Sequence, residues 1–320
     1  NAVARKRQRE WEHLRAIMWL PEEEIRKKLH VHYLCTPKGL DMFGQFLTEE
    51  CPWESGATLL KVIHRGQYEH CMQKFLRSKD LTFIIQVIRI TGLLRLKYFR
   101  DRILQLMADN KENLELQYAG FLALSLMGMR SSLVLLCEQL EYTRGLSFRS
   151  LKEVFAVFSG DKAGLYRDLL NSPDPYIRRI AIKNIGDDGI TKLANRLLPL
   201  LDTEDVNLRY DLIRTFGQLS FAPAGNAIVP ALESPNWTIR NAAVVALASI
   251  DARKYLPQMI QGLKDKEWWV RYNSARELCR RIPPEVHKEM IPGLNDRYAS
   301  EILTYVIEEK KLLGDGEAEK

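Results

Sequence analysis

The positions of the apolar residues along most of the chain fit amphipathic helices. Between residues 174 and 186, apolar side chains recur three or four positions apart from Ile177 to Ile185, as they do along one face of a helix. Residues 190–201 repeat this spacing and predict a second helix. Alternation of apolar and polar residues, the pattern of a half-buried strand, is not sustained anywhere in the sequence. We therefore expect an all-α protein.

The helical pattern repeats with a period of 31 residues. An arginine marks the same position in four successive periods, an apolar residue precedes it, and an acidic or amide residue stands four positions earlier. A fixed period of this length is the sequence signature of a repeat solenoid, in which each unit packs mainly on its neighbours. The four arginines are Arg178, Arg209, Arg240 and Arg271.

Each period is expected to form a pair of helices. Asp174 can accept from the free N–H groups of the first turn, Pro175 can take the first helical position, and Gly186 is suited to end the helix. Weaker copies of the pattern precede Asp174, and one of them, near residue 146, lacks the arginine. We predict an α-α superhelix, a repeat solenoid with about six to seven helix pairs over residues 80–294.

The regions on either side of the array follow different patterns. Residues 21–79 also predict helices, but without a clear period, and form a divergent helical region. Residues 295–320 predict a closing helix, whose charged face would cover the last repeat, followed by a tail. Residues 1–20 are a basic segment that opens with Asn1-Ala2, a dipeptide that resembles the scar of a cleaved tag.

The basic segment leaves two interpretations open. Its cations could stand on the cytoplasmic side of a membrane helix removed from the chain, or they could begin an ordinary solvated helix. The first interpretation predicts membrane attachment through a segment that precedes Asn1. The residues concerned are Arg5, Lys6, Arg7 and Arg9.

Charge and cysteine content bear on location and on partners. The chain has 47 basic and 41 acidic residues and a net charge of +6, which permits an acidic partner or a nucleic acid without requiring either. The cysteines are dispersed and include no CxxC pair, as expected for reduced thiols in a reducing compartment. We therefore expect a cytoplasmic protein. The cysteines are Cys35, Cys51, Cys71, Cys137 and Cys279.

The repeated segments resemble HEAT repeats, and among these the short bacterial repeats of phycobilisome-lyase-type proteins. The resemblance implies a bacterial protein with a superhelical surface that grips another macromolecule, and a scaffold or adaptor role is the commonest one for such arrays. Function depends on sites placed on the fold, so the candidate residues are weighed separately. The segments that carry the resemblance are 174–186, 205–219, 236–250 and 267–282.

The arginine column has two interpretations. In the first, each arginine holds a helix start in place, and the column is a structural ladder like those of HEAT arrays, with Asp174 and Asp205 one helical turn away. In the second, the arginines form a positive stripe for phosphate or carboxylate groups. We favour the ladder, with the members Asp174, Arg178, Asp205, Arg209, Arg240 and Arg271.

A second column carries aromatic residues at the expected helix starts, two or three positions before an arginine. These rings could pack at the seam between repeats. Alternatively they form an exposed ridge that anchors a partner, because Trp and Tyr dominate interface hot spots. The contact residues expected of such a ridge are Tyr176, Trp237, Trp268 and Trp269, with Arg240 and Arg271 beside them.

Metal and catalytic chemistry find little support in the sequence. Cys51, His64 and His70 have the spacing of half a zinc finger but lack the second half. The sequence also lacks a glycine-rich phosphate loop, a nucleophile elbow and an HExxH motif. We expect no metal, no cofactor and no catalytic residue.

Three functions stay open. The first is a non-enzymatic scaffold that binds another protein. The second is a nucleic-acid-binding HEAT-like protein such as an alkylpurine DNA glycosylase, a resemblance that implies aromatic and basic residues of the kind found at 268–281. The third, a lyase or chaperone for a tetrapyrrole, rests on the name of the repeat subfamily alone.

Overall fold

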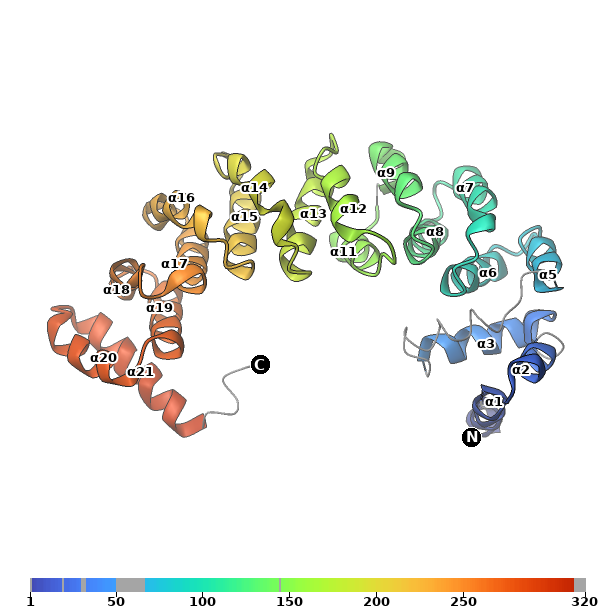
Figure 1. The fold of residues 1–320 in the computed structure, drawn as a ribbon, viewed down its shortest axis with the longest axis horizontal. Coiled ribbons are helices and arrows are strands. Elements are labelled where there is room, and N and C mark those ends of the chain that lie inside the picture. The colour runs from blue at the N-terminus through green and yellow to red at the C-terminus, as the bar shows by residue number, and fades with distance from the viewer. Residues whose placement is uncertain (1, 19, 30–32, 50–66, 144, 314–320) are drawn as a thin grey trace. The chain divides into compact units, whose positions relative to one another are not determined.

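The computed structural model describes residues 2–18, 20–29, 33–49, 67–143 and 145–313. Every regular element within these ranges is a helix, as Figure 1 shows. The prediction of an all-α protein is therefore confirmed.

The chain divides into two compact units, Asn1–Asp174 and Pro175–Lys320. The described part of the first unit contains four helices that precede the array and three helix pairs, with a short helix α10 (Leu140–Thr143) between the second pair and the third. The preceding helices are α1 (Ala2–Met18), α2 (Glu22–Leu29), α3 (Pro37–Glu49) and α5 (Gln67–Phe75); the pairs are α6 (Leu81–Leu93) with α7 (Arg100–Asp109), α8 (Leu114–Leu126) with α9 (Arg130–Glu138), and α11 (Phe148–Ala156) with α12 (Lys162–Leu169).

The second unit contains four more pairs and a closing helix. In two pairs the second member is broken into short helical pieces around α14 (Ala194–Leu197) and α16 (Gly225–Ile228). The first members of the pairs are α13 (Pro175–Asp187), α15 (Val206–Gln218), α17 (Trp237–Asp251) and α19 (Trp268–Arg281); α18 (Leu256–Leu263) and α20 (Pro284–Met290) pair with the last two, and α21 (Arg297–Leu313) closes the unit.

First helices pack on first helices within the second unit. The helices α13, α15, α17, α19 and α21 contact one another in that order, while α14, α16 and α18 form the other layer (Figure 1). Where α17, α18, α19 and α21 meet, the apolar side chains form one buried cluster that includes Ala248, Leu263, Leu278 and Leu303. The seven pairs of the two units thus agree with the predicted repeat array.

Small residues allow the first helices to approach closely. A Cβ atom on Gly217 of α15 would lie 2.8 Å from the Cα atom of Ala246 in α17. A Cβ atom on Gly92 of α6 would lie 2.5 Å from the Cα atom of Ala123 in α8. Each distance is shorter than real Cβ contacts, so glycine is required at both contacts.

Two details of the helix boundaries differ from the sequence-based expectation. Gly186 does not end α13, which runs to Asp187, and the left-handed turn falls on Gly189 with φ +65°. The expected second helix at 190–201 is also interrupted, with 3₁₀ turns on both sides of α14. Pro199 lies in the later turn, and proline cannot donate the hydrogen bond that a continuous α-helix requires there.

Polar side chains also join successive repeats. The carboxylate of Asp211 in α15 is buried and accepts from Arg179 Nε at 2.8 Å and from Lys183 Nζ at 3.1 Å, both in α13. Further along the array, Asn273 Nδ2 of α19 donates to Asn241 Oδ1 of α17 at 2.9 Å. A buried or half-buried polar group at these two repeat junctions thus finds its partner in the adjacent repeat.

The basic N-terminal segment forms α1, which packs against α2 and α3. The guanidinium of Arg7 lies 4.3 Å from the ring centre of Trp11, a cation–π contact. Within the described residues, no helix has both the length and the hydropathy needed to cross a bilayer.

We expect Gly217→Ala to destabilise the second unit. Alanine is the better helix former by about 1 kcal/mol, but overpacking a tight contact costs about 1–3 kcal/mol, and the opposing atom is backbone. Urea unfolding followed by circular dichroism should therefore show a lower midpoint for the variant. Gly293→Ala is the matched control, because nothing lies within 4 Å of a Cβ atom built there; a higher midpoint for Gly217→Ala would contradict the close contact.

Candidate functional site

The start of α19 carries the largest group of exposed aromatic residues in the described array. Val270, Ser274 and Leu278 of this helix are buried in the core. With 3.6 residues per turn, Trp268 and Trp269 then fall on the opposite side, and their exposed fractions are 44% and 53%.

Three rings of α19 form one cluster, which we call the aromatic cluster: Trp268, Trp269 and Tyr272. Trp268 stacks on Tyr272 with ring centres 4.9 Å apart and planes 9° from parallel. Trp269 stands edge-on to Trp268, with ring centres 4.8 Å apart and planes at 83°. Both arrangements are favoured for aromatic pairs, and the stack joins positions i and i+4 of one helix.

The closing helix α21 holds and extends the aromatic cluster. The Tyr272 hydroxyl donates to Glu309 Oε2 at 3.0 Å, and burial together with this contact raises the pKa of Tyr272. Two tyrosines of α21 are exposed: Tyr298, at 65%, lies 5.6 Å from the Arg271 guanidinium, and Tyr305 is exposed to 52%. Aromatic surface therefore continues from α19 onto α21.

The other predicted contact residues lie on earlier repeats. Trp237 is the first residue of α17, one repeat before Trp268, and its exposed fraction is 39%. Tyr176 lies on α13, three repeats before Trp269, and its side chain is half-buried. The predicted ridge is thus spread over several repeats, with its densest part on α19.

Sequence reasoning missed three aromatic residues of this surface and one aliphatic residue of the column. Tyr272 follows Trp268 by four positions, so helical spacing could have placed them together. Tyr298 and Tyr305 lie seven positions apart on α21, which puts them on one face two turns apart. Val206, the first residue of α15, is exposed like Trp237 and Trp268 in the same position of the repeat.

The Arg240 side chain is buried, and its guanidinium group donates hydrogen bonds to a carboxylate and to a backbone carbonyl. Its Nε and Nη2 atoms donate to the carboxylate of Asp265 at 2.6 and 2.8 Å, and Nη1 donates to the carbonyl oxygen of Ser234 at 2.8 Å. Asp265 precedes α19, so this ion pair ties α17 to the start of the next repeat. Asp265 Oδ1 also accepts from the backbone N–H of Glu267 at 2.8 Å.

Arg271 makes the equivalent backbone contacts one repeat later. Its Nη1 atom donates to the carbonyl oxygens of Asp265 at 2.8 Å and Lys266 at 3.0 Å, the positions that match Ser234 and Pro235. Both arginines therefore hold the chain that leads into their own helix, and their charged groups are engaged there.

For the remaining members of the predicted ladder, the structure gives cap and backbone contacts. The Asp205 carboxylate caps α15 by accepting from the backbone N–H groups of Asn207 and Leu208. The backbone N–H of Arg209 donates to the Asp205 carbonyl oxygen at 2.9 Å, and the Asp174 N–H donates to Ser172 Oγ at 3.2 Å. Arg178 is half-buried on α13. A ladder role for these residues stays a prediction.

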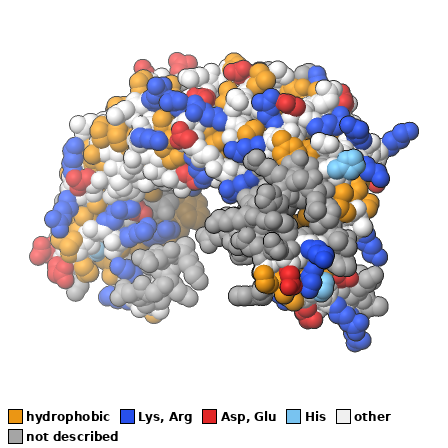
Figure 2. All heavy atoms as spheres, turned by 45° about the vertical axis from the view of Figure 1, so that its right-hand side comes forward, with side chains coloured by type: hydrophobic (Ala, Val, Ile, Leu, Met, Phe, Trp, Pro, Cys, Tyr) orange, Lys and Arg blue, Asp and Glu red, His pale blue; other side chains and the backbone are white. Residues whose placement is uncertain are grey.

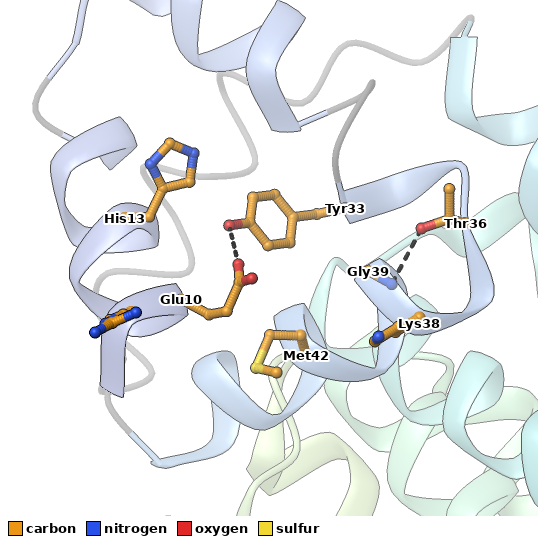
Figure 3. A pocket seen from close by; sticks show the side chains of 8 residues that line it. Glu10, His13, Tyr33, Thr36, Lys38, Gly39 and Met42 are labelled. Carbon is orange, nitrogen blue, oxygen red and sulfur yellow. Dashed lines mark hydrogen bonds between the residues drawn. The ribbon is translucent and has the colours of Figure 1, made fainter. Parts of the chain in front are cut away.

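A polar cavity of about 530 Å³ lies between α1 and α3 in the first unit. Figure 3 shows Tyr33 pointing at Glu10, whose carboxylate accepts from the Tyr33 hydroxyl at 3.1 Å. Burial and this contact raise the pKa of Tyr33. The Thr36 hydroxyl accepts from the Gly39 N–H at 3.1 Å and thus caps α3 (Figure 3). The acid and the phenol satisfy each other.

The described surface mixes charges of both signs. On the face that Figure 2 shows, Lys and Arg side chains are interspersed with acidic and hydrophobic ones. Proteins that bind duplex DNA gather their cations along one stripe. At the opposite end of α19 from the aromatic cluster, Arg281 is engaged with Glu277 at 2.6 Å and with Ser249 Oγ at 2.9 Å.

Only one of the three residues with zinc-finger spacing belongs to the described part of the chain. Cys51 and His64 lie outside the described residues, and His70 is exposed on α5. Among the described residues, no group of three or more Cys, His, Asp and Glu side chains could hold a metal ion.

Comparison with known proteins gives a family for the end of the array. The family model for HEAT repeats matches residues 225–307, from α16 into α21. This part of the chain therefore matches HEAT repeats, and the sequence-based recognition of such repeats is confirmed. Of the pairs that begin before residue 225, those that start with α13 and α15 share the 31-residue spacing of α17 and α19. A comparison with curated proteins gives no match.

Similar solved structures include two other helical proteins. One is an engineered protein from the Northeast Structural Genomics Consortium, with 15% identity, a TM-score of 0.43, and coverage of 93% of this chain and 98% of that chain. The other is the complex of CpcE and CpcF of phycocyanin lyase from Nostoc sp. PCC7120, with 15% identity, a TM-score of 0.32, and coverage of 79% and 91%. At these values neither likeness bears on what the HEAT repeats of this chain bind.

We expect the two equivalent arginines to differ in their contribution to stability. Arg240→Met leaves the Asp265 carboxylate buried without its ion-pair partner, which costs about 3 kcal/mol. Arg271→Met removes two hydrogen bonds to backbone carbonyls and costs about 1 kcal/mol. Urea unfolding of both variants provides the comparison, and equal losses would contradict the difference in burial.

The stability of the second unit should also fall in acid because of Asp265. Burial opposes ionisation of this carboxyl group, but the hydrogen bonds from Arg240 and the Glu267 N–H outweigh burial and hold the Asp265 pKa below its ordinary value of 3.8. A lowered folded-state pKa contributes stability that is present above the unfolded pKa and lost as pH falls through the folded pKa, here below about pH 4. Unfolding free energies measured from pH 6 downwards should fall less steeply for Asp265→Asn than for the unchanged protein.

Proposed function

We propose that this HEAT-repeat chain is a non-enzymatic scaffold that binds another protein through the aromatic cluster and the adjoining tyrosines of α21. The observation that carries the proposal is the fixed set of exposed rings on α19. A contiguous exposed aromatic surface of this kind is typical of interaction sites, and Trp and Tyr supply most of the energy of such interfaces.

The arrangement of the rings favours tight binding. Stacking of Trp268 on Tyr272 and the hydrogen bond from Tyr272 to Glu309 fix the rings before a partner arrives. Ordering a free side chain costs about 0.5–1.5 kcal/mol on binding, and rings already held avoid much of this cost. Burial of the aromatic cluster by a partner would therefore lose little of its favourable free energy to the ordering of side chains.

The polar groups near the cluster support binding more than catalysis. Arg271 holds backbone carbonyls and lies by Tyr298, while Glu309 accepts from Tyr272. Each of these groups acts on the shape of the surface, and shape and apolar contact are what a protein partner recognises. A contribution of Trp237, Val206 and Tyr176 to a longer interface is part of the same proposal.

The wider expectations about location stay predictions. A cytoplasmic protein attached to the membrane through a segment before Asn1 would be found in the membrane fraction of its cells, and salt washing would not release it. A nucleic-acid-binding protein would instead raise the fluorescence anisotropy of labelled duplex DNA at low salt, and the effect would fall steeply as salt is added.

The partner can be captured at the proposed surface. A photo-crosslinking residue in place of Tyr305 lies at the edge of the aromatic surface, and the same residue in place of Leu200 lies in the other helix layer. A protein that crosslinks at position 305 and not at position 200 supports the proposal. Equal crosslinking at both positions would contradict it.

With the partner in hand, we expect Trp268→Ala to weaken binding by about 2 kcal/mol, roughly 30-fold in Kd, because the variant removes both the contact ring and its stack on Tyr272. Titration calorimetry measures the loss, and circular dichroism checks that helix content is kept. Leu200→Ala is the control for an exposed apolar residue elsewhere and should leave Kd unchanged. Tyr272→Phe keeps the stack but loses the bond to Glu309, so its effect should be smaller than that of Trp268→Ala.

A further inference from the structure

Two cysteines of the first unit lie side by side although they are far apart in sequence. Cys35 lies in the bend that leads into α3, and Cys71 lies on α5. Their Sγ atoms are 2.8 Å apart, and both side chains are partly accessible to solvent. The dispersed cysteines of the sequence gave no sign of this pair, because 36 residues separate its members.

Sulfur atoms at this distance can share a proton or a covalent bond. One thiol can donate a weak hydrogen bond to the other, and this is the contact in the reduced protein. The same proximity allows the two sulfur atoms to join without a large movement of either chain segment. Cys137 and Cys279 differ from this pair, since both of them are buried while Cys35 and Cys71 are partly accessible.

We propose that Cys35 and Cys71 are a reversible oxidation site, and that a peroxide converts them to an intramolecular disulfide. The overall reaction joins two thiols and consumes one hydrogen peroxide, with the release of two water molecules. The two sulfur atoms are oxidised and the peroxide oxygen atoms are reduced, so no further reactant is needed.

The oxidation takes place in two steps. One sulfur atom of the pair attacks the peroxide, breaks the O–O bond and becomes a sulfenic acid, while its thiol proton passes to the leaving hydroxide and forms water. The second sulfur atom, which lies 2.8 Å away in the reduced protein, then loses its proton, attacks the first sulfur atom and displaces the hydroxyl group as water.

The disulfide would tie together elements that already share a neighbour. Both α3 and α5 pack against α6, the first helix of the array. A disulfide between Cys35, just before α3, and Cys71 of α5 would link these two helices directly, in addition to the contact that each makes with α6. Oxidation would then fix the helices that precede the array to its first repeat.

The test uses the full chain carrying Cys51→Ser, so that Cys51, which lies outside the described residues, cannot react in place of Cys35 or Cys71. The protein is treated with hydrogen peroxide, blocked with N-ethylmaleimide in denaturant and digested for mass spectrometry. We expect a crosslinked peptide containing Cys35 and Cys71, maleimide on Cys137 and Cys279, and loss of the crosslink after dithiothreitol. Maleimide on both Cys35 and Cys71, or sulfinic acid on either without a crosslink, would overturn the proposal.

Single variants test the sulfenic acid intermediate in the same Cys51→Ser background. In Cys35→Ser and in Cys71→Ser the second sulfur is missing, so the cysteine that reacts first should stop at a sulfenic acid that dimedone traps in the variant that retains it. Dimedone on neither variant would overturn the two-step route, and circular dichroism of both variants confirms that the helices are intact.

Discussion

Each helix pair of this array leaves one apolar flank uncovered until the next pair packs against it. This constraint accounts for the small residues where first helices meet, such as Gly217 against Ala246, and for the buried Asp211 that finds its cations in the preceding repeat. It also leaves the first turn of each first helix outside the packed layers. The side chains there are free to differ from one repeat to the next, which is where the aromatic surface of α19 is found.

The sequence allowed much of the fold to be predicted, because helical spacing and a constant period are local and repeated signals. It predicted the helix pairs and the equivalence of Arg240 and Arg271, and it offered exposure of Trp268 and Trp269 as one of two interpretations. It could not supply the partner of Arg240, since Asp265 lies in the next repeat and only packing shows which carboxylate faces the guanidinium. The interruption at Pro199 was readable in the sequence, but the apolar spacing around it was given more weight.

Two contacts between residues far apart in the sequence could not be predicted from the repeat pattern. Tyr272 meets Glu309 across 37 residues, and Cys35 meets Cys71 across 36. Neither separation corresponds to the period of 31 residues, so the repeat pattern gave no reason to join them. Tyr272 meets Glu309 where the array meets its closing helix, and Cys35 and Cys71 both precede the array, so the regular spacing predicts neither contact.

The position of Asp265 has a mechanical consequence. Its side chain is bonded to Arg240 of α17, its carbonyl oxygen to Arg271 of α19, and its carboxylate also holds the N–H of Glu267, next to Trp268. A force that a bound protein exerts on Trp268 would therefore be shared with the preceding repeat through one carboxylate. The stiffness of the surface under load would then be set by a residue that the partner never touches.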